Sequence, residues 1–429
     1  MQPTATNCKQ ATGLTAFGLP RWWSAAVLMS LVWIGFRPFS DGAGAQGGDL
    51  ANQVGFALLG LFAIHAATRM ERRRRTALLQ PGWLVVGFLL LASVIAADSP
   101  AAALRGVVFS AVVVLCAGVA TALPRTLADL TGALVAAALA ALAFSFVAVA
   151  LFPAVGIHDG SGYEAQHAGL WRGVYAHKNV ASYVAGAFVV VGLFAARNGR
   201  PLSGWITVAL ALLFVVEAGS KTVLGILPAA ILVGWLAARF RCPVLRALAL
   251  AAPLAALLGI TLGAALHEGA NALLQNIAPG MTFTGRLDLW RFAAEQIEKA
   301  PAFGYGFESF WTTPRALGQE QPIELSWDVR RIVHAHNSYL DAAITFGTVG
   351  AGALFAVVVA RPLWHFATVP KGGNANRVAQ MYATLWLFAA LGGCLESFFL
   401  RRGDPVWFVM ALSLFGLQVT HAMTRRSHP

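Results

Sequence analysis

Long apolar stretches, separated by short polar or charged connections, run along almost the whole chain. A helix needs about 20 mostly apolar residues to cross a bilayer, and most of these stretches approach that length. The pattern therefore predicts an all-α integral membrane protein with about twelve transmembrane helices. The predicted spans are 22–36, 50–67, 83–97, 104–123, 131–153, 178–196, 202–218, 223–238, 245–265, 336–360, 378–397 and 405–423.

Composition excludes the soluble classes of protein. Of the 429 residues, 58% are hydrophobic and 12% are charged, whereas a soluble domain carries about 25% charged residues. A disordered chain would be poor in apolar residues. The sequence therefore predicts three regions and no separate soluble domain: nine spans in 1–265, one long outer loop with amphipathic helices in 266–335, and three spans in 336–429.

The distribution of the 31 basic residues predicts how the chain is oriented in the membrane. They concentrate in alternate connections, among them Arg69 to Arg75, Arg239 to Arg246 and Arg361 to Arg377. Because basic connections stay in the cytoplasm, both termini are predicted to be cytoplasmic. An alternative for the first span is a signal peptide cleaved near Ala43-Gly44-Ala45, which leaves the remaining topology unchanged.

The outer loop contains one amphipathic segment. Thr284 is placed to cap a helix from Gly285 to Lys299, which would end before Pro301. Leu287, Trp290, Ala294 and Ile297 share one face of that helix. We expect the helix to lie on the membrane surface.

Two predicted spans open with similar residues. Ala176-His177-Lys178-Asn179 precedes one span, and Ala335-His336-Asn337 precedes another. Unpaired N–H groups and the helix dipole attract anions to such helix starts. The alternative interpretation is that each Asn caps its helix and each His lies among lipid headgroups.

Several basic residues lie at the predicted outer ends of spans, where positive charge opposes the orientation signal. Lys221, between two apolar spans with almost no loop, is the clearest example. Charge held near hydrocarbon is costly and often functional, although snorkelling to lipid phosphates and local ion pairs would also accommodate it. The set comprises Arg37, Arg105, Arg172, Lys178, Lys221, Arg286, Arg401 and Arg402.

These segments resemble the O-antigen ligase and polymerase superfamily, which includes exopolysaccharide polymerases. The resemblance is carried, in this order, by Arg172 to Asn179, Ser220-Lys221-Thr222, Gly285 to Trp290, Gly304-Tyr305-Gly306-Phe307, His334 to Leu340 and Phe346 to Gly350. It covers about a third of the chain directly. The number of spans and the single long outer loop extend it over nearly all of the chain.

The resemblance implies an inverting, metal-independent membrane glycosyltransferase of the bacterial inner membrane with a periplasmic active site. Its donor is a glycan on undecaprenyl diphosphate, and its acceptor is a sugar hydroxyl of lipid A core in a ligase, which we prefer. A polymerase, which uses a lipid-linked glycan as acceptor, is the first alternative. A transporter of lipid-linked glycans is the second. Membrane lipids are the other expected partners, and no nucleic acid is expected.

The reaction needs a base at the attacking hydroxyl and positive charge at the departing diphosphate. His336 is the predicted base, because the positive end of a helix favours a neutral imidazole; His334 is the second choice. Arg172, Lys178, Lys221 and Arg286 are the first predicted diphosphate ligands, followed by Arg401 and Arg402. His177, Asn179 and Asn337 are predicted to orient these groups.

No cofactor is expected, because the donor is already activated and no Gly-rich nucleotide loop occurs. A metal site is the alternative to the basic cluster, but no HExxH or CxxC spacing is present. Its candidate ligands would be His158, Asp159, Glu164, His167, His177, His334 and His336.

Overall fold

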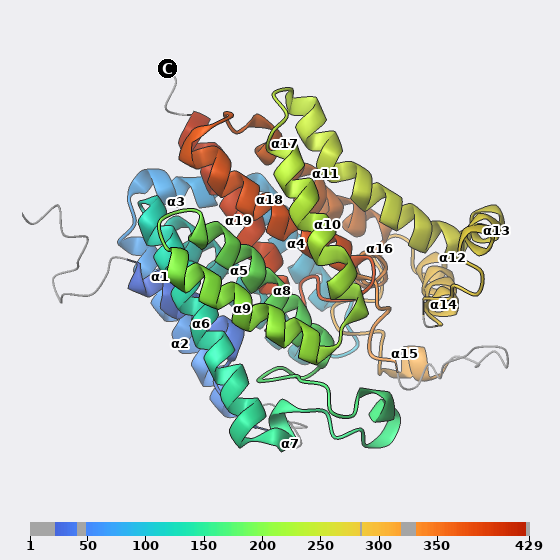
Figure 1. Cartoon of the computed structure of the whole chain (residues 1–429). Helices are drawn as coiled ribbons and strands as arrows, with labels where there is room; N and C mark the ends of the chain where they lie inside the picture. The colour runs from blue at the N-terminus through green and yellow to red at the C-terminus, as the bar shows by residue number, and fades with distance from the viewer. Residues whose placement is uncertain (1–21, 41–48, 284, 319–331, 426–429) are drawn as a thin grey trace, which may run out of the picture.

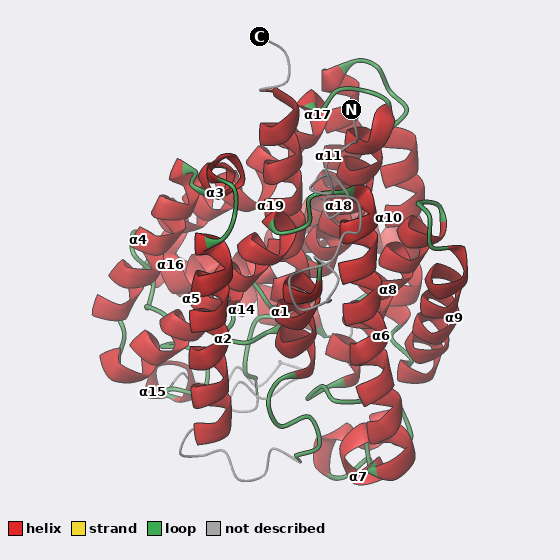
Figure 2. Cartoon of the chain, turned by 90° about the vertical axis from the view of Figure 1, so that its left-hand side faces the viewer, coloured by secondary structure: helices red, strands yellow, loops and turns green. Residues whose placement is uncertain are grey.

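A computed structural model describes residues 22–40, 49–283, 285–318 and 332–425. Throughout this part of the chain the protein is all-α, with no β-strand (Figures 1 and 2). The longer helices are α1 Trp23–Ile34, α2 Leu50–Thr68, α4 Pro81–Ile95, α5 Pro100–Ala122, α6 Leu127–Leu151, α8 Lys178–Ala196, α9 Pro201–Ala218, α10 Lys221–Ala237, α11 Pro243–Leu258, α13 Glu268–Ile277, α14 Arg286–Lys299, α16 Ser338–Phe355, α18 Gly373–Gly393 and α19 Pro405–Arg425. The short helices are α3 Arg72–Leu78, α7 Pro153–Gly156, η2 Gly162–His167, η3 Gly259–Gly263, α12 Ala264–Leu266, α15 Pro314–Leu317, η5 Ala356–Ala360 and α17 Arg361–Thr368.

Local sequence explains where many of these helices begin. Proline is the first residue of several, including α4, α5 and α9, where its missing N–H has no helical partner to lose. Before α6, the Thr126 hydroxyl and the Asp129 carboxylate form a reciprocal capping box. Gly219 ends α9 in the left-handed conformation, with φ of 62°.

The number of spans differs from the predicted twelve. Within the described residues, eight helices are long and apolar enough to cross a membrane, or nine if α3 and α4, bent by 49°, form one span. A helix lies at each predicted span, but α1 and α10, with 12 and 17 residues, are too short to qualify. The 21-residue α18 begins with the polar residues Asn374, Asn376 and Arg377 and is not among the eight.

The centre of the bundle is formed by α8, α18 and α19. In the apolar windows of α8 and α19, 78% and 83% of the residues are buried, against 22% in the span from Pro243 to Leu266. Small residues permit close packing: a Cβ built on Gly192 of α8 would lie 2.7 Å from the Gly204 carbonyl of α9. The outer helices therefore leave their apolar faces for lipid.

The bundle has two distinct ends. In both views α7 and α15 lie at the lower end, whereas α3, α17 and the end of α19 lie at the upper end (Figures 1 and 2). The upper end thus holds the Arg72–Arg75 run of α3 and the residues around Lys371, which follow α17. Both connections are predicted to be cytoplasmic, and their side of the membrane stays a prediction. The alternative cleavage site, Ala43-Gly44-Ala45, lies outside the described residues.

The predicted loop helix is present as α14, but its surroundings differ from the prediction. Leu287, Trp290 and Ala293 are buried in a second core with Ile344 of α16, instead of lying on a membrane surface. Trp290 is fully buried, and its indole N–H donates to the Ala335 carbonyl at 3.0 Å. An amphipathic pattern cannot distinguish lipid from a protein face, and here the protein covers it. The proposed cap, Thr284, lies outside the described residues.

The chain after α14 is bonded directly to the backbone of α16. The amides of Tyr305 and Thr348 donate to the carbonyls of Ile344 and Pro301 at 2.8 and 2.7 Å. Gly347 has φ of 69°, and a Cβ there would lie 2.4 Å from the Ala302 backbone. Glycine is therefore required where the two backbones meet.

Candidate active site

A cavity of about 1000 Å³ lies among the ends of α1, α2, α5, α8 and α19. Both α8 and α19 begin at its wall, and the residues just before α16 and the connection before α19 complete it. It brings together several predicted site residues from distant parts of the sequence. Those that line it are His177, Asn179, His334, His336, Arg401 and Arg402, and Arg37 and Arg105 line it as well.

The start of α16 fixes the position of His336. The Asn337 side chain is buried and accepts the N–H groups of Tyr339 and Leu340 at 3.0 and 3.1 Å, so Asn337 caps the helix. Its own N–H donates to the Ser397 hydroxyl at 2.9 Å. His336, just before it, adopts φ of 50°, an uncommon value for a residue other than glycine. The cap thus holds a strained His336 at the cavity wall.

The Glu396 carboxylate bonds to three other side chains of the site. One carboxylate oxygen lies 3.0 Å from His336 Nδ1. The other accepts from Arg286 Nη2 at 3.0 Å and from Asn179 Nδ2 at 2.9 Å. Residues from α8, α14 and both connections therefore converge on one carboxylate.

Glu396 is not among the site residues predicted from the sequence. The predicted-span assignment explains why. It assigned this residue to the end of a predicted span, 378–397, whereas α18 ends at Gly393 and Glu396 lies in the connection to α19. An acidic residue at the end of an apolar run, followed closely by Arg401 and Arg402, was the signal that could have found it.

Electrostatics keep Glu396 ionised. Burial alone would raise its pKa, but Arg286 and His336 hold the pKa of the carboxyl below its ordinary value. An ionised carboxylate only accepts hydrogen bonds, so His336 Nδ1 carries the proton that Glu396 accepts. In the neutral form of the ring, the lone pair is then on Nε2, and the His336 side chain is 30% exposed. His336 is therefore prepared to take a proton from a molecule in the cavity.

His334 is held differently. Its Nδ1 accepts the N–H of His336 at 3.2 Å, so its lone pair is already used. Burial, the neighbouring His336 and Arg401 lower the pKa of His334 well below its ordinary value. The ring is thus a neutral N–H donor and a poorer proton acceptor than His336.

Donor atoms of His334, His336 and Glu396 all lie within 4.8 Å of one another, a spacing compatible with a metal ion. Their existing bonds argue against one, because His334 Nδ1 accepts a backbone N–H and Glu396 already binds Arg286. The other candidate metal ligands gather near the start of α8. The rings of His158, His167 and His177 lie 5.1–5.8 Å apart.

Two of these imidazoles, those of His158 and His177, also bind the backbone. His158 Nε2 accepts the N–H of Lys178 at 3.1 Å, and His177 Nδ1 accepts that of Asn179 at 3.1 Å. Asp159 accepts the N–H of Ser161 at 2.9 Å. The Glu164 side chain lies outside the described part of the structure. The cluster therefore supports the first turn of α8.

The predicted diphosphate ligands fall into two groups. Arg401 and Arg402 line the cavity, and Arg286 reaches its wall through Glu396. Three others do not line the cavity, namely Arg172, Lys178 and Lys221. The Arg172 guanidinium donates to the Val155 and Ala154 carbonyls at 2.8 and 2.9 Å, and Lys178 Nζ lies 3.5 Å from the Gly219 carbonyl.

Arg105 is the cation best able to meet an anion in the cavity. It is exposed at the cavity wall and forms no hydrogen bond or ion pair with any residue that the structure describes. By contrast, Arg402 lies 3.3 Å from Glu308, and Arg37 lies 3.4 Å from Asp49. Arg401 donates to the Ser397 carbonyl at 3.2 Å.

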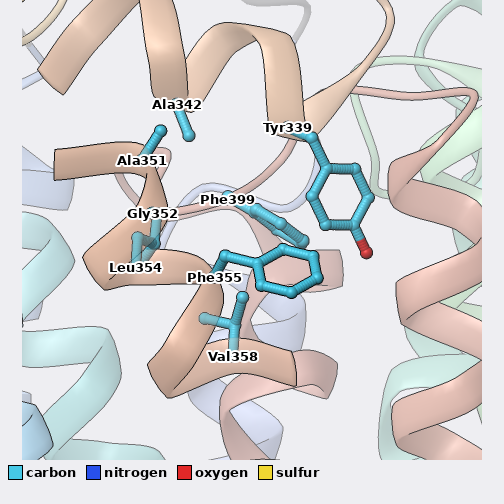
Figure 3. A pocket seen from close by; sticks show the side chains of 8 residues that line it. All are labelled: Tyr339, Ala342, Ala351, Gly352, Leu354, Phe355, Val358 and Phe399. Carbon is cyan, nitrogen blue, oxygen red and sulfur yellow. The ribbon is translucent and has the colours of Figure 1, made fainter. Parts of the chain in front are cut away.

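A second hollow, of about 240 Å³, lies beside α16. The rings of Tyr339, Phe355 and Phe399 face it together with the small side chains Ala342 and Ala351 (Figure 3). Its one polar side-chain atom, the Tyr339 hydroxyl, donates to the Ala390 carbonyl at 3.1 Å. No carboxylate, imidazole or basic side chain lines this hollow, so the larger cavity is the better candidate for an active site.

Comparison with known proteins points to a family for part of the chain. A family model described as O-antigen ligase matches residues 205–355. This region belongs to the O-antigen ligase family. The match spans α9 to α16 and includes Arg286, His334 and His336. It supports a membrane enzyme of the O-antigen ligase or polymerase type. No curated protein matches the chain.

Proposed function

We propose that this O-antigen ligase family protein transfers a glycan from undecaprenyl diphosphate to a sugar hydroxyl of lipid A core, with inversion and without a metal ion. The observation that carries the proposal is the Glu396–His336 pair at the wall of a cavity that also presents guanidinium groups. A base and a set of cations are the two requirements of this substitution.

In the proposed step, His336 Nε2 takes the proton of the acceptor hydroxyl as its oxygen attacks the anomeric carbon. A new C–O bond forms on one side of that carbon while the bond to the diphosphate oxygen breaks on the other, which inverts the configuration. Glu396 stabilises the imidazolium that results, as a carboxylate does for histidine bases in general. The diphosphate leaves with its lipid.

We assign the departing diphosphate to the guanidinium groups at the cavity, Arg105, Arg401 and Arg402. Arg286 contributes less, because Glu396 already balances its charge. Asn179 and Asn337 orient Glu396 and the start of α16, whereas His177 supports α8. Arg172, Lys178 and Lys221 act outside the cavity wall in this proposal.

The deciding experiment gives purified protein in detergent a lipid-linked glycan and, in separate reactions, lipid A core or a second lipid-linked glycan. Product with lipid A core alone supports the ligase. Elongated lipid-linked glycan identifies the polymerase, which is the alternative. Movement of the glycan across vesicles without any new bond would overturn both and leave a transporter.

We further propose that the active site faces the periplasm. The exposed native Cys242 lies between α10 and α11 in a predicted cytoplasmic connection, and the other described cysteines, Cys116 and Cys394, are buried. An impermeant thiol reagent applied to cells with a permeabilised outer membrane should leave Cys242 unlabelled. It should label a cysteine placed at the exposed Asp159 in a Cys242→Ser background. The reverse result would contradict the orientation.

A further inference from the structure

The cavity wall formed by the end of α1 and the start of α2 carries a polar network that the proposed transfer step does not use. Asp49 Oδ2 accepts the Asn52 side-chain amide at 2.7 Å and lies 3.4 Å from Arg37 Nη1. Gln53 lines the cavity beside them, and its side chain forms no hydrogen bond with the described residues. We call Arg37, Asp49, Asn52 and Gln53 the α1–α2 wall.

Two further residues that line the cavity contain buried polar atoms without a partner among the described residues. Neither Trp33 Nε1 nor Tyr183 Oη forms a hydrogen bond with any residue that the structure describes, although Trp33 is only 3% exposed and Tyr183 only 2%. An unsatisfied buried polar group destabilises the fold, and native proteins contain few of them. Both residues line the cavity. Such groups are expected where a ligand supplies the missing partner.

The combination of groups indicates the chemistry of that ligand. The Gln53 amide, the Trp33 indole N–H and the Tyr183 phenol offer both donors and acceptors, as hydroxyl groups require. Asp49 and Asn52 support this wall, because they already bind the start of α2, Arg37 and the Phe36 N–H. Phe56 and Phe109 line the same cavity and provide apolar faces for C–H groups. We propose that the α1–α2 wall, with Trp33 and Tyr183, is a binding subsite for the hydroxyl groups of a sugar.

This inference rests on the proposed function for its choice of glycans, but it concerns residues outside the family match at 205–355. Both the glycan of the donor and the sugar of the acceptor carry hydroxyl groups that fit this subsite. Since Trp33 Nε1 and Tyr183 Oη are closed to water, a hydroxyl group reaches them only after a small shift of the wall.

The test uses three variants that remove single polar groups: Gln53→Ala, Trp33→Phe and Tyr183→Phe. The matched controls are Gln380→Ala and Trp407→Phe. Gln380 is half-buried in α18 and does not line the cavity. Trp407 also has an indole N–H without a partner and is fully buried, but it does not line the cavity.

Binding is measured in detergent with three probes: undecaprenyl diphosphate, the same lipid carrying its glycan, and lipid A core. Each of the three variants should bind one glycan about 3- to 10-fold more weakly, the effect of one neutral hydrogen bond. Binding of undecaprenyl diphosphate alone should not change. Weakening for the glycan-carrying lipid assigns the subsite to the donor; weakening for lipid A core assigns it to the acceptor.

Thermal stability separates a binding role from a structural one. Removing an unpartnered polar atom leaves no orphaned group behind, so Tyr183→Phe should keep or raise the melting temperature. Unchanged affinity for both glycans, or equal losses in the controls, would overturn the subsite. If the wild type transfers no glycan but the variants still lose affinity for one, the proposed function fails and the subsite stands.

Discussion

The starts of α8 and α16 are similar in sequence but reach Glu396 through different residues. At α16, Asn337 caps the helix, and the preceding His336 bonds to Glu396. At α8, His177 caps the helix, and Asn179 bonds to Glu396 instead. The His and Asn residues have exchanged roles.

The two helix starts show that the choice of capping residue decides which side chain is available for chemistry. A cap must accept the N–H groups of the first turn, so its acceptor atom is committed. His177 uses Nδ1 in this way, whereas His336 keeps Nε2 for a substrate. Of the two similar segments, only the one at α16 therefore places a His beside Glu396, where we propose that it acts as the base.

The largest effect is expected at His336. His336→Ala should lower transfer about 10²- to 10⁴-fold, the usual contribution of general base catalysis, while donor binding persists. His336→Arg should not restore activity, because a cation cannot take the proton, and excess chelator should not change wild-type activity. Transfer is followed with labelled lipid-linked glycan. Full activity in His336→Ala would remove this residue from the mechanism.

Smaller losses are expected when Glu396 or its partner Asn179 is changed. Glu396→Gln keeps the shape but loses the charge that stabilises the imidazolium, so kcat should fall about 10- to 100-fold. Asn179→Ala removes only a neutral donor and should cost less than 10-fold. Equal losses in kcat for the two variants would show that Glu396 serves packing alone.

Basic residues that line the cavity should affect the donor KM more than a basic residue that does not line it. Arg105→Ala and Arg401→Ala should raise the apparent donor KM about 10-fold, with weaker effects at high salt because both side chains are exposed. Lys221→Ala, outside the wall, should change it less than 3-fold. A larger effect for Lys221 than for Arg105 would move the diphosphate to the α9–α10 side.

A smaller effect is expected in the dependence of stability on pH. The unfolded chain protonates His334 near pH 6.5, whereas the folded chain does so only at lower pH. Its contribution to stability is thus complete above pH 6.5 and is lost as the pH falls below that value. Glu396, with an ordinary value of 4.5 and a lower folded pKa, adds a loss only below pH 4.5. His334→Gln should therefore flatten melting temperatures between pH 6.5 and 4.5.

The smallest effect concerns the caps themselves. Asn337→Ala and His177→Ala should each lower the free energy of unfolding by about 1 kcal/mol. Asn337→Ala should also reduce activity, because the cap positions His336, whereas His177→Ala should affect activity less. Chemical denaturation and transfer assays on the same preparations test this contrast. A His177 variant as inactive as the Asn337 variant would contradict the exchange of roles.

Apolar runs located the helices well, because a bilayer imposes length and composition on each segment. The same patterns do not predict which distant segments contact one another. Arg172 and Lys221 were expected at the same site as Arg401, but only the structure shows that they do not line the cavity. Glu396 was missed because its partners come from α8, α14 and the start of α16. The burial of α14 likewise depends on α16, far along the chain.

The backbone bonds around Gly304 and Gly347 have a mechanical consequence. Since the segment after α14 is joined to α16 by main-chain bonds, and glycine is required where the two backbones meet, we expect the two to move as one piece. His336, at the start of α16, is thus anchored to a rigid frame. We therefore expect any widening of the cavity for a bulky glycan to come from movement of the ends of α1 and α2 that line it.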